Sequence, residues 1–166
     1  PEDHPQLRFF RDGGFEVVKR SRLLGAISEG KYVMAVAGTH GKTTTTTMAA
    51  WFNRVAGGGG SAFLGGISEN FGSNLLVDTS SDYIVIEADE FDRSFLTLNP
   101  EKAVITSMDA DHMDIYGNRD SIIAAFEDFA CRVVPEGGLF IKKGLEIVYV
   151  ETMEQVLRVA FCEKKE

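Results

Sequence analysis

The chain has 166 residues, of which 44% are hydrophobic and 25% are charged, and no apolar run approaches the length of a membrane span. This composition is ordinary for one globular domain with a real core. The net charge of -8 argues against nucleic acid or an anionic membrane surface as a partner, because both repel an acidic protein.

The two cysteines, Cys131 and Cys162, lie far apart and lack metal-binding spacing. We expect core thiols of a cytoplasmic protein rather than a disulfide or a metal site. The polar N-terminus, Pro1 to Pro5, has no features of a secretory signal peptide, and we expect it to lie within a longer protein.

The first thirty residues are expected to contribute structure rather than chemistry. Their pattern predicts a short helix at 6–11, a turn at 12–14, a strand at 15–18 and a second helix at 20–28.

A buried strand, a loop bounded by glycines and the start of a helix follow one another between residues 33 and 44. Gly38 and Gly41 have no Cβ, so the backbone N–H groups of the loop can approach phosphate oxygens, and the helix adds its own N–H groups. Lys42 would neutralise the β- and γ-phosphates, and the hydroxyl of Thr43 would hold Mg²⁺. We expect Lys42 to be exposed in this anion site.

The loop departs from the general phosphate-binding pattern G-x-x-x-x-G-K-[ST], because Val36 occupies the place of the first glycine. What remains is the shorter form G-T-H-G-K-T. A chance Gly-Lys-Thr at an ordinary helix cap is the alternative interpretation. The strand before the loop, the helix after it and the acidic strand end described below favour nucleotide binding.

The helix that follows begins with a run of threonines, which are poor helix formers because β-branching restricts χ1. An apolar face formed by Met48, Trp51, Phe52 and Val55 predicts that packing holds this helix. Residues 57–60 are four glycines that end it. Residues 61–78 predict short strands or a loop that approaches a ligand.

Residues 83–86 form an apolar β-strand of the kind covered on both faces, and an acidic segment, Glu87-Ala88-Asp89-Glu90-Phe91-Asp92, follows it. Ligands collect at the carboxyl ends of parallel strands, so these acids are placed beside the phosphates. A solvated acidic turn is the alternative for some of the four carboxylates. We expect at least one of them to bind Mg²⁺, with Glu87 the expected ligand because it comes first after the strand.

A second buried strand, at 103–106, is followed by Asp109-Ala110-Asp111-His112-Met113-Asp114. A lone histidine is usually structural, but His112 lies among three aspartates at the end of a strand. From these residues alone, a structural role and a metal or phosphoryl role for His112 both stay open.

The remaining segments complete an alternation of strands and helices. The pattern predicts a helix from about residue 120 with Ile122, Phe126, Phe129 and Val133 on its apolar face, strands at 139–141 and 147–150, and a final helix around 153–160. The expected fold is α/β: a three-layer α/β/α sandwich with a mainly parallel sheet, like that of P-loop NTPases.

Three motifs in this order resemble the ATP-binding central domain of the Mur ligases: G-T-H-G-K-T-T-T, then E-A-D-E-F-D-R-S-F, then D-A-D-H-M-D-I-Y-G. The resemblance covers roughly residues 5 to 145. It implies that Lys42 and His112 are catalytic and that Thr43, Glu87 and His112 bind metal, with His112 on a second ion near the γ-phosphate. The implied nucleotide-binding residues are Gly38, Thr39, His40, Gly41, Lys42, Thr43 and Thr44.

Within this family the motifs are most similar to the branch that joins L-alanine to UDP-N-acetylmuramate, with ATP and Mg²⁺ as cofactors. The implied reaction passes through an acyl phosphate and needs no covalent enzyme nucleophile. A murein tripeptide recycling ligase is the alternative within the family, although residues 89–95 and 113–116 favour the first. A non-catalytic nucleotide-binding module is the alternative of another class, and a P-loop NTPase of another family is a more distant one.

The resemblance also predicts how the chain is divided. Residues 1–30 look like a remnant of the N-terminal UDP-binding domain and its link, residues 31–145 like a partial central ATPase domain, and residues 146–166 like a tail that departs from the family pattern. We therefore expect a fragment of a ligase that does not complete the reaction alone.

Overall fold

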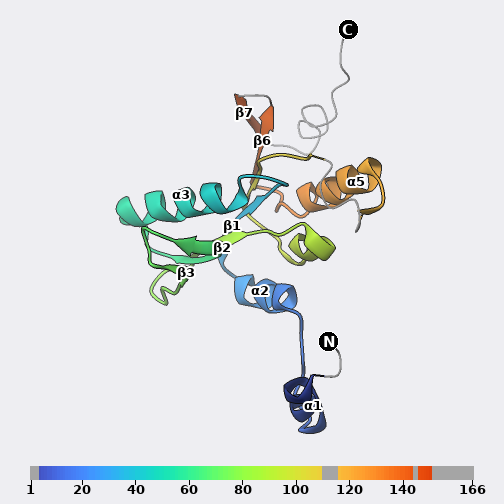
Figure 1. The fold of residues 1–166 in the computed structure, drawn as a ribbon. Helices are drawn as coiled ribbons and strands as arrows, with labels where there is room; N and C mark the ends of the chain where they lie inside the picture. Colours follow the sequence, from blue (N-terminus) through green and yellow to red (C-terminus); the bar gives the residue numbers. More distant parts are fainter. Residues whose placement is uncertain (1–3, 110–115, 144–145, 151–166) are drawn as a thin grey trace.

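The computed structural model describes residues 4–109, 116–143 and 146–150, and its centre is a seven-stranded sheet (Figure 1). The strand order is β3-β2-β4-β1-β5-β6-β7. The five inner strands run parallel, and β3 and β7 pair antiparallel at the two edges. The strands are β1 (Tyr32–Ala37), β2 (Ser61–Ser68), β3 (Ser73–Leu76), β4 (Tyr83–Glu87), β5 (Lys102–Ile105), β6 (Gly138–Lys143) and β7 (Glu146–Val150).

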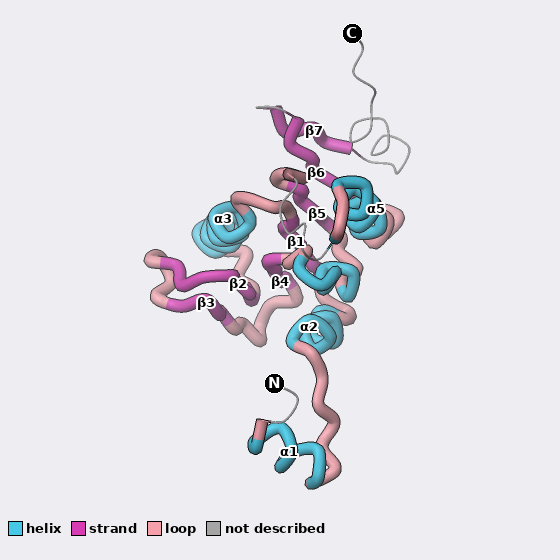
Figure 2. Tube along the Cα trace, turned by 45° about the vertical axis from the view of Figure 1, so that its right-hand side comes forward, coloured by secondary structure: helices cyan, strands magenta, loops and turns pink. Residues whose placement is uncertain are grey.

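Helices cover both faces of this sheet (Figure 2). On one face lies α3 (Lys42–Val55), and on the other lie α2 (Arg20–Ser28), the 3₁₀ helix η1 (Phe91–Thr97) and α5 (Arg119–Ala130). The first helix, α1 (Pro5–Asp12), stands away from the sheet and has no buried residue. The predicted three-layer α/β/α sandwich with a mainly parallel sheet is confirmed.

The central strand β4 is buried on both of its faces, which explains why its sequence is continuously apolar. In β4, Ile84 and Ile86 belong to the large core under α5 and η1, whereas Val85 belongs to the smaller core under α3. All three side chains are at most 2% exposed. A strand that is buried on both faces has no polar side, so the alternation typical of edge strands is absent.

The packing of α3 differs from the prediction. Its expected apolar face is on the surface, with exposures that include 50% for Met48, 63% for Phe52 and 67% for Val55. The buried residues are instead Thr46 and Ala50. Small side chains let the helix lie close to the sheet, so the buried face is the one that permits close approach rather than the most hydrophobic one.

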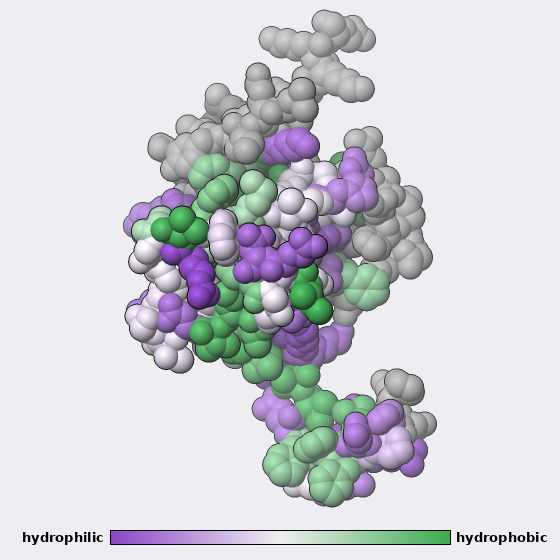
Figure 3. All heavy atoms as spheres, turned by 60° about the vertical axis from the view of Figure 1, so that its left-hand side comes forward, coloured by the Kyte–Doolittle hydropathy of each residue, from purple (hydrophilic) through white to green (hydrophobic). Residues whose placement is uncertain are grey.

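The predicted strand at residues 15–18 is wrong, because this segment is an extended connection without a ladder partner in the described part of the chain. Phe15, Val17 and Val18 are all more than a third exposed, and Figure 3 shows apolar surface along the connection that leads to α1. A β-former pattern becomes a strand only where another strand edge is available for pairing.

Most other predicted elements are present. The buried face of α5 contains Ile122, Phe126 and Phe129 as predicted, with Val133 packed partly against them. The expectation of a core thiol is wrong for Cys131, which is exposed just after α5. Cys162 and the helix predicted around 153–160 lie outside the described residues. No helix in the described ranges is long and apolar enough to cross a membrane.

Candidate functional site

The loop between β1 and α3 spans residues 38–41, and its shape depends on two glycines. Gly38 has φ +131° and Gly41 has φ +79°, in a region that residues with a Cβ rarely adopt. A Cβ on Gly38 would also fall 2.1 Å from Thr106 Oγ1 and 2.8 Å from the backbone nitrogen of Ser107. Gly38 is therefore required by close packing as well as by backbone conformation.

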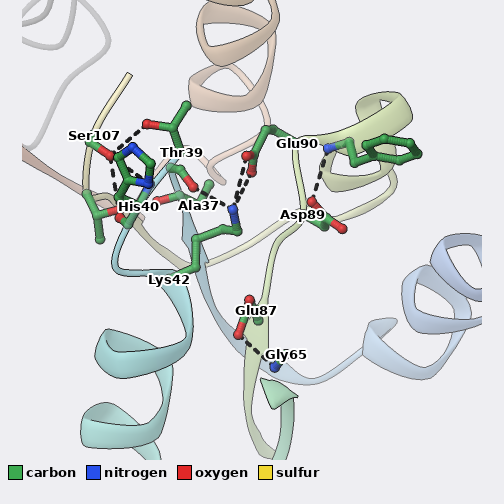
Figure 4. Close-up of polar contacts among 12 residues, drawn as sticks. Ala37, Thr39, His40, Lys42, Gly65, Glu87, Asp89, Glu90 and Ser107 are labelled. Carbon is green, nitrogen blue, oxygen red and sulfur yellow. Dashed lines mark hydrogen bonds and ion pairs between the residues drawn. The ribbon is translucent and has the colours of Figure 1, made fainter. Parts of the chain in front are cut away.

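Two hydroxyl residues that follow β5, Thr106 and Ser107, hold this loop, and Figure 4 shows Ser107 beside His40. The hydroxyl of Thr106 donates to the carbonyl oxygen of His40 at 2.5 Å, and Ser107 Oγ accepts from the N–H of His40 at 2.9 Å. The N–H of Thr39 donates to the carbonyl oxygen of Ser107 at 3.1 Å. The loop is thus held in shape by the neighbouring strand, so a ligand meets a preformed site.

The N-terminus of α3 supplies the donors for an anion. A hydrogen bond of 3.0 Å from the N–H of Thr45 to the carbonyl oxygen of Gly41 closes the first helical turn. The N–H groups of Lys42, Thr43 and Thr44 precede this bond and have no partner within the helix. These groups and the helix dipole place partial positive charge at the N-terminus of α3, which is the arrangement that an anion requires.

Lys42 contacts the phosphate loop and one carboxylate of the acidic segment (Figure 4). Its Nζ lies 2.7 Å from the carbonyl oxygen of Gly38, and 3.0 Å and 2.9 Å from the two carboxylate oxygens of Glu90. The side chain of Lys42 is 14% exposed and that of Glu90 is 1% exposed. The expectation of an exposed Lys42 is therefore wrong, because a buried carboxylate draws the ammonium group inward.

Thr43 faces Glu87, the carboxylate expected to bind Mg²⁺. The hydroxyl of Thr43 donates to Glu87 Oε1 at 3.0 Å, and the N–H of Gly65 on β2 donates to Glu87 Oε2 at 2.7 Å. A Cβ on Gly65 would lie 2.2 Å from Glu87 Oε1, so any larger residue at this position would displace the carboxylate from where it lies. Three segments, the start of α3, β2 and the end of β4, thus meet at one pair of oxygen atoms.

These oxygen atoms suit a magnesium ion. Mg²⁺ prefers hard oxygen ligands and is usually held by one or two carboxylates together with water and substrate phosphates. Thr43 and Glu87 supply one hydroxyl and one carboxylate beside the anion site. Within the described ranges no group of three or more His, Cys, Asp or Glu side chains comes together.

The four acids after β4 have different partners. Glu87 faces Thr43, and the buried Glu90 faces Lys42. Asp89 is exposed and its carboxylate accepts from the N–H of Phe91, so this side chain caps the start of η1. The side chain of Asp92 lies outside what the structure describes. The acidic segment is therefore divided between one carboxylate that faces Thr43 and one that faces Lys42, with Asp89 between them bonded to the start of η1.

His40 lies on the outer side of the loop, with its Nε2 3.8 Å from Asp109 Oδ2 and both side chains exposed. Asp109 also donates its backbone N–H to the hydroxyl of Thr39 at 3.0 Å. His112 lies outside the described residues, so its predicted metal role stays a prediction. The described residue on each side of that segment contacts the site: Asp109 bonds Thr39, and the Tyr116 hydroxyl donates to the carbonyl oxygen of Glu90.

Sequence reasoning missed three contributors to the site, namely Glu90 as the partner of Lys42 and the hydroxyl clamp of Thr106 and Ser107. Glu90 is one of four acids in one short segment, and no local feature of the sequence separates a buried acid from a solvated one. Position at the end of a central parallel strand was the available signal for Thr106 and Ser107, because such positions border the ligand crevice.

Comparison with known proteins places the chain in a family. The family model described as the Mur ligase middle domain matches residues 36–164. The chain therefore belongs to the Mur ligase family, through a match that includes the loop, the acidic segment, β4 and β5.

Relatives with curated names are similar over most of this chain. The UDP-N-acetylmuramate--L-alanine ligases of Christiangramia forsetii and Phocaeicola vulgatus are 52% and 48% identical over 147 residues, which is 89% of this chain and 32% of each relative. The chain thus spans about a third of the length of these relatives.

Solved structures agree with the fold. The murein peptide ligase described as UDP-N-acetylmuramate:L-alanyl-gamma-D-glutamyl-meso-diaminopimelate ligase, from Neisseria meningitides, matches with TM-score 0.75 and 27% identity over 95% of this chain and 52% of that one. The UDP-N-acetylmuramate-alanine ligase of Thermotoga maritima matches with TM-score 0.70 and 28% identity over 80% of this chain and 31% of that one.

Proposed function

We propose that this chain is the ATP-binding part of a peptidoglycan-precursor ligase that joins L-alanine to UDP-N-acetylmuramate. The observation that supports this most directly is the contact between Thr43, at the N-terminus of α3, and Glu87, at the end of β4, with Lys42 next to Thr43 in the first turn of the helix. A cation, a hydroxyl and a carboxylate beside free helical N–H groups are what a magnesium-bound polyphosphate requires.

The proposed division of labour follows from the side chains. The N–H groups at the start of α3 and the ammonium of Lys42 would hold the β- and γ-phosphates of ATP. Thr43 and Glu87 would hold the Mg²⁺ ion, which supplies charge neutralisation for the transferring phosphoryl group when bound. His112, a predicted ligand of a second ion, remains part of the proposal through its sequence motif.

The chemistry we propose has two stages. The carboxylate of UDP-N-acetylmuramate attacks the γ-phosphorus of ATP, so that an acyl phosphate forms and ADP leaves. The amine of L-alanine then attacks the acyl carbon, and an amide forms as inorganic phosphate leaves. The residues of this chain would bind and orient the phosphates and balance their charge during the first stage, because phosphoryl transfer depends mainly on positioning and electrostatics.

Two observations bear on the choice of substrate. Relatives named UDP-N-acetylmuramate--L-alanine ligase reach 52% identity. Among the solved structures, the murein peptide ligase of Neisseria meningitides at 27% identity and the UDP-N-acetylmuramate-alanine ligase of Thermotoga maritima at 28% do not separate the two substrates. The similarity to the L-alanine ligases favours L-alanine as the substrate that is joined to UDP-N-acetylmuramate. A murein tripeptide is the second candidate for this substrate. A comparison of the two acceptor reactions in a full-length relative would separate them.

The activity of the whole enzyme needs more than this chain, in our proposal. The relatives are about three times longer than this chain. The boundaries that we propose assign residues 1–30 to an N-terminal domain and its link, residues 31–145 to the ATPase unit and residues 146–166 to a tail. The family match itself continues to residue 164. Near-attack positioning of two substrates accounts for about 7–11 kcal/mol of a barrier. We therefore expect the chain alone to bind nucleotide without forming product.

Calorimetry with Mg-ATP tests the nucleotide-binding proposal. We expect the wild-type chain to bind and Lys42→Ala to weaken binding by about tenfold or more, as loss of a charged hydrogen-bonding partner does. Lys31→Ala is the matched control, because Lys31 pairs with Asp82 at the opposite end of β1 and should leave affinity unchanged. Equal affinity in the wild type and Lys42→Ala would refute phosphate binding by this loop.

A second measurement addresses the ligase itself. The chain is incubated with ATP, Mg²⁺, UDP-N-acetylmuramate and L-alanine, and mass spectrometry is used to look for the amide product. We expect none above background from this chain and product from a full-length relative. Product that depends on both substrates would show that the other two thirds of the relatives are dispensable, whereas absence of nucleotide binding in the first experiment would refute the proposed function altogether.

A further inference from the structure

Glu90 is a buried carboxylate that the proposed chemistry does not use. Its side chain is 1% exposed, and its carboxylate oxygens lie 3.0 Å and 2.9 Å from the Nζ of Lys42. A buried charge is costly unless it is paired, so Lys42 stabilises Glu90 as much as Glu90 holds Lys42. The same ammonium group is the one that should bind the phosphates.

The backbone of Glu90 is fixed from two directions. Its carbonyl oxygen accepts from the hydroxyl of Tyr116 and from the N–H of Arg93, the latter at 3.0 Å. Two residues earlier, the N–H of Ala88 donates to Val36 at 2.9 Å and continues the pairing of β4 with β1. Glu90 therefore presents its carboxylate from a rigid frame, and Lys42 is the more mobile partner by virtue of its longer side chain.

The ammonium group of Lys42 donates two hydrogen bonds, to the carbonyl oxygen of Gly38 at 2.7 Å and to Glu90 Oε1 at 3.0 Å. Glu90 Oε2 lies 2.9 Å away as an ion-pair contact and accepts no hydrogen bond of its own from the described residues. A phosphate that draws the ammonium group toward the nucleotide must therefore weaken the ion pair with Glu90 or the contact with Gly38. Gly38 O belongs to the loop that must stay in shape, so the contact with Glu90 is the one that can be exchanged.

We propose that Glu90 is a positioning residue that holds Lys42 before the nucleotide binds, competes with phosphate for its ammonium group and takes it back when the nucleotide leaves. This inference rests on nucleotide binding at the loop and goes beyond it. Glu90 then lowers nucleotide affinity, because binding must break a charge-assisted contact, and it favours release of ADP after each turnover.

Substitution Glu90→Gln tests the competition. The amide keeps the shape and one acceptor but removes the charge, so we expect Mg-ADP to bind about tenfold more tightly, or ~1.4 kcal/mol. The unfolding temperature should fall, because Lys42 loses its counter-ion. Tighter binding in a less stable protein is a combination that simple structural damage does not give. Asp89→Asn is the matched control: it removes the same charge one residue away at an exposed site, and screening by solvent leaves an effect of about twofold at most.

A double-mutant cycle shows whether the effect passes through the lysine. In a Lys42→Ala background the Glu90→Gln change should leave Mg-ADP affinity unchanged, since there is no ammonium to compete for. Glu90→Asp is the second variant with which to test the competition if Glu90→Gln does not fold. It keeps the charge but moves it one methylene away from the ammonium, and we expect tightening smaller than in Glu90→Gln.

The outcomes separate this inference from the proposed function. No binding of Mg-ADP by the wild type would refute the nucleotide site itself. Binding by the wild type with unchanged or weaker binding in Glu90→Gln and Glu90→Asp would refute the competition alone. Equal tightening in Asp89→Asn would assign the effect to general charge, and equal tightening in the Lys42→Ala background would assign it to another group, so either result overturns the role of Glu90 as the partner of Lys42.

Discussion

Gly65 offers a way to displace the proposed magnesium ligand without touching it. Its N–H donates to Glu87 Oε2 at 2.7 Å, and a Cβ at this position would lie 2.2 Å from Oε1 and 2.5 Å from Cδ of the same carboxylate. The φ of Gly65 is not in the left-handed region, so alanine strains no backbone there. Gly65→Ala therefore acts only on the end of a flexible side chain.

The magnitude follows from these distances. Carbon atoms in contact are separated by about 3.5 Å, so the carboxylate of Glu87 must retreat by about 1 Å. Such a shift breaks the 3.0 Å contact between Glu87 Oε1 and the hydroxyl of Thr43. Loss of a charged hydrogen-bonded arrangement costs about 1.5–3 kcal/mol, which predicts about 10- to 100-fold weaker magnesium-dependent nucleotide binding. Stability should change by about 0.5 kcal/mol at most, because the side chain can move.

Calorimetry with ADP in the presence of Mg²⁺ and in the presence of a chelator measures the effect. Gly66→Ala is the matched control, since its Cβ would meet nothing closer than Thr43 Cγ2 at 3.7 Å, an ordinary contact. We expect Gly65→Ala to lose the magnesium dependence and Gly66→Ala to keep it. Equal magnesium dependence in the two variants would refute the assignment of Glu87 as the magnesium ligand.

Two further predictions concern stability. Gly38→Ala should destabilise the fold by about 2 kcal/mol or more, because φ is +131° and the new Cβ would lie 2.1 Å from Thr106 Oγ1. Gly30→Ala should cost about 1–2 kcal/mol, because φ is +71° but the space around it is open. Denaturant unfolding compares the two variants, and equal losses of stability would contradict the packing argument. Hydrogen bonds from the Ser80 hydroxyl and from the Gly60 and Ser80 N–H groups lower the pKa of Asp78 to about 2 in the folded protein, from about 3.8 in the unfolded chain. The ionised carboxylate of Asp78 therefore stabilises the fold above pH 3.8, and this contribution is lost as the pH falls through 2. The unfolding temperature of Asp78→Asn should therefore lie below that of the wild type at pH 6 and approach it near pH 2, and a constant gap would contradict the assignment.

Several elements could be predicted because their signals are local. The strand at 83–86 is recognisable from four consecutive apolar β-formers, and the turn at Gly38 and Gly41 from residues without a Cβ before a helix. The wrong predictions were those that depended on a partner elsewhere in the chain. Residues 15–18 have a β-forming pattern but no adjoining strand edge among the described residues, and the buried face of α3 was decided by the shape of the sheet rather than by hydrophobicity.

The sequence by itself determined the family, the α/β class and the strand–loop–helix unit that we propose binds phosphate, because the strand, the glycine turn and the helix N-terminus are contiguous in the chain. Only the tertiary structure decided which acid meets which cation. Glu87 faces Thr43 and Glu90 faces Lys42, although the two acids are three residues apart in one acidic segment. The reason is geometric: the chain leaves β4 after Glu87 and turns into η1, so the two carboxylates depart in different directions, and that turn is fixed by pairing and packing with distant segments.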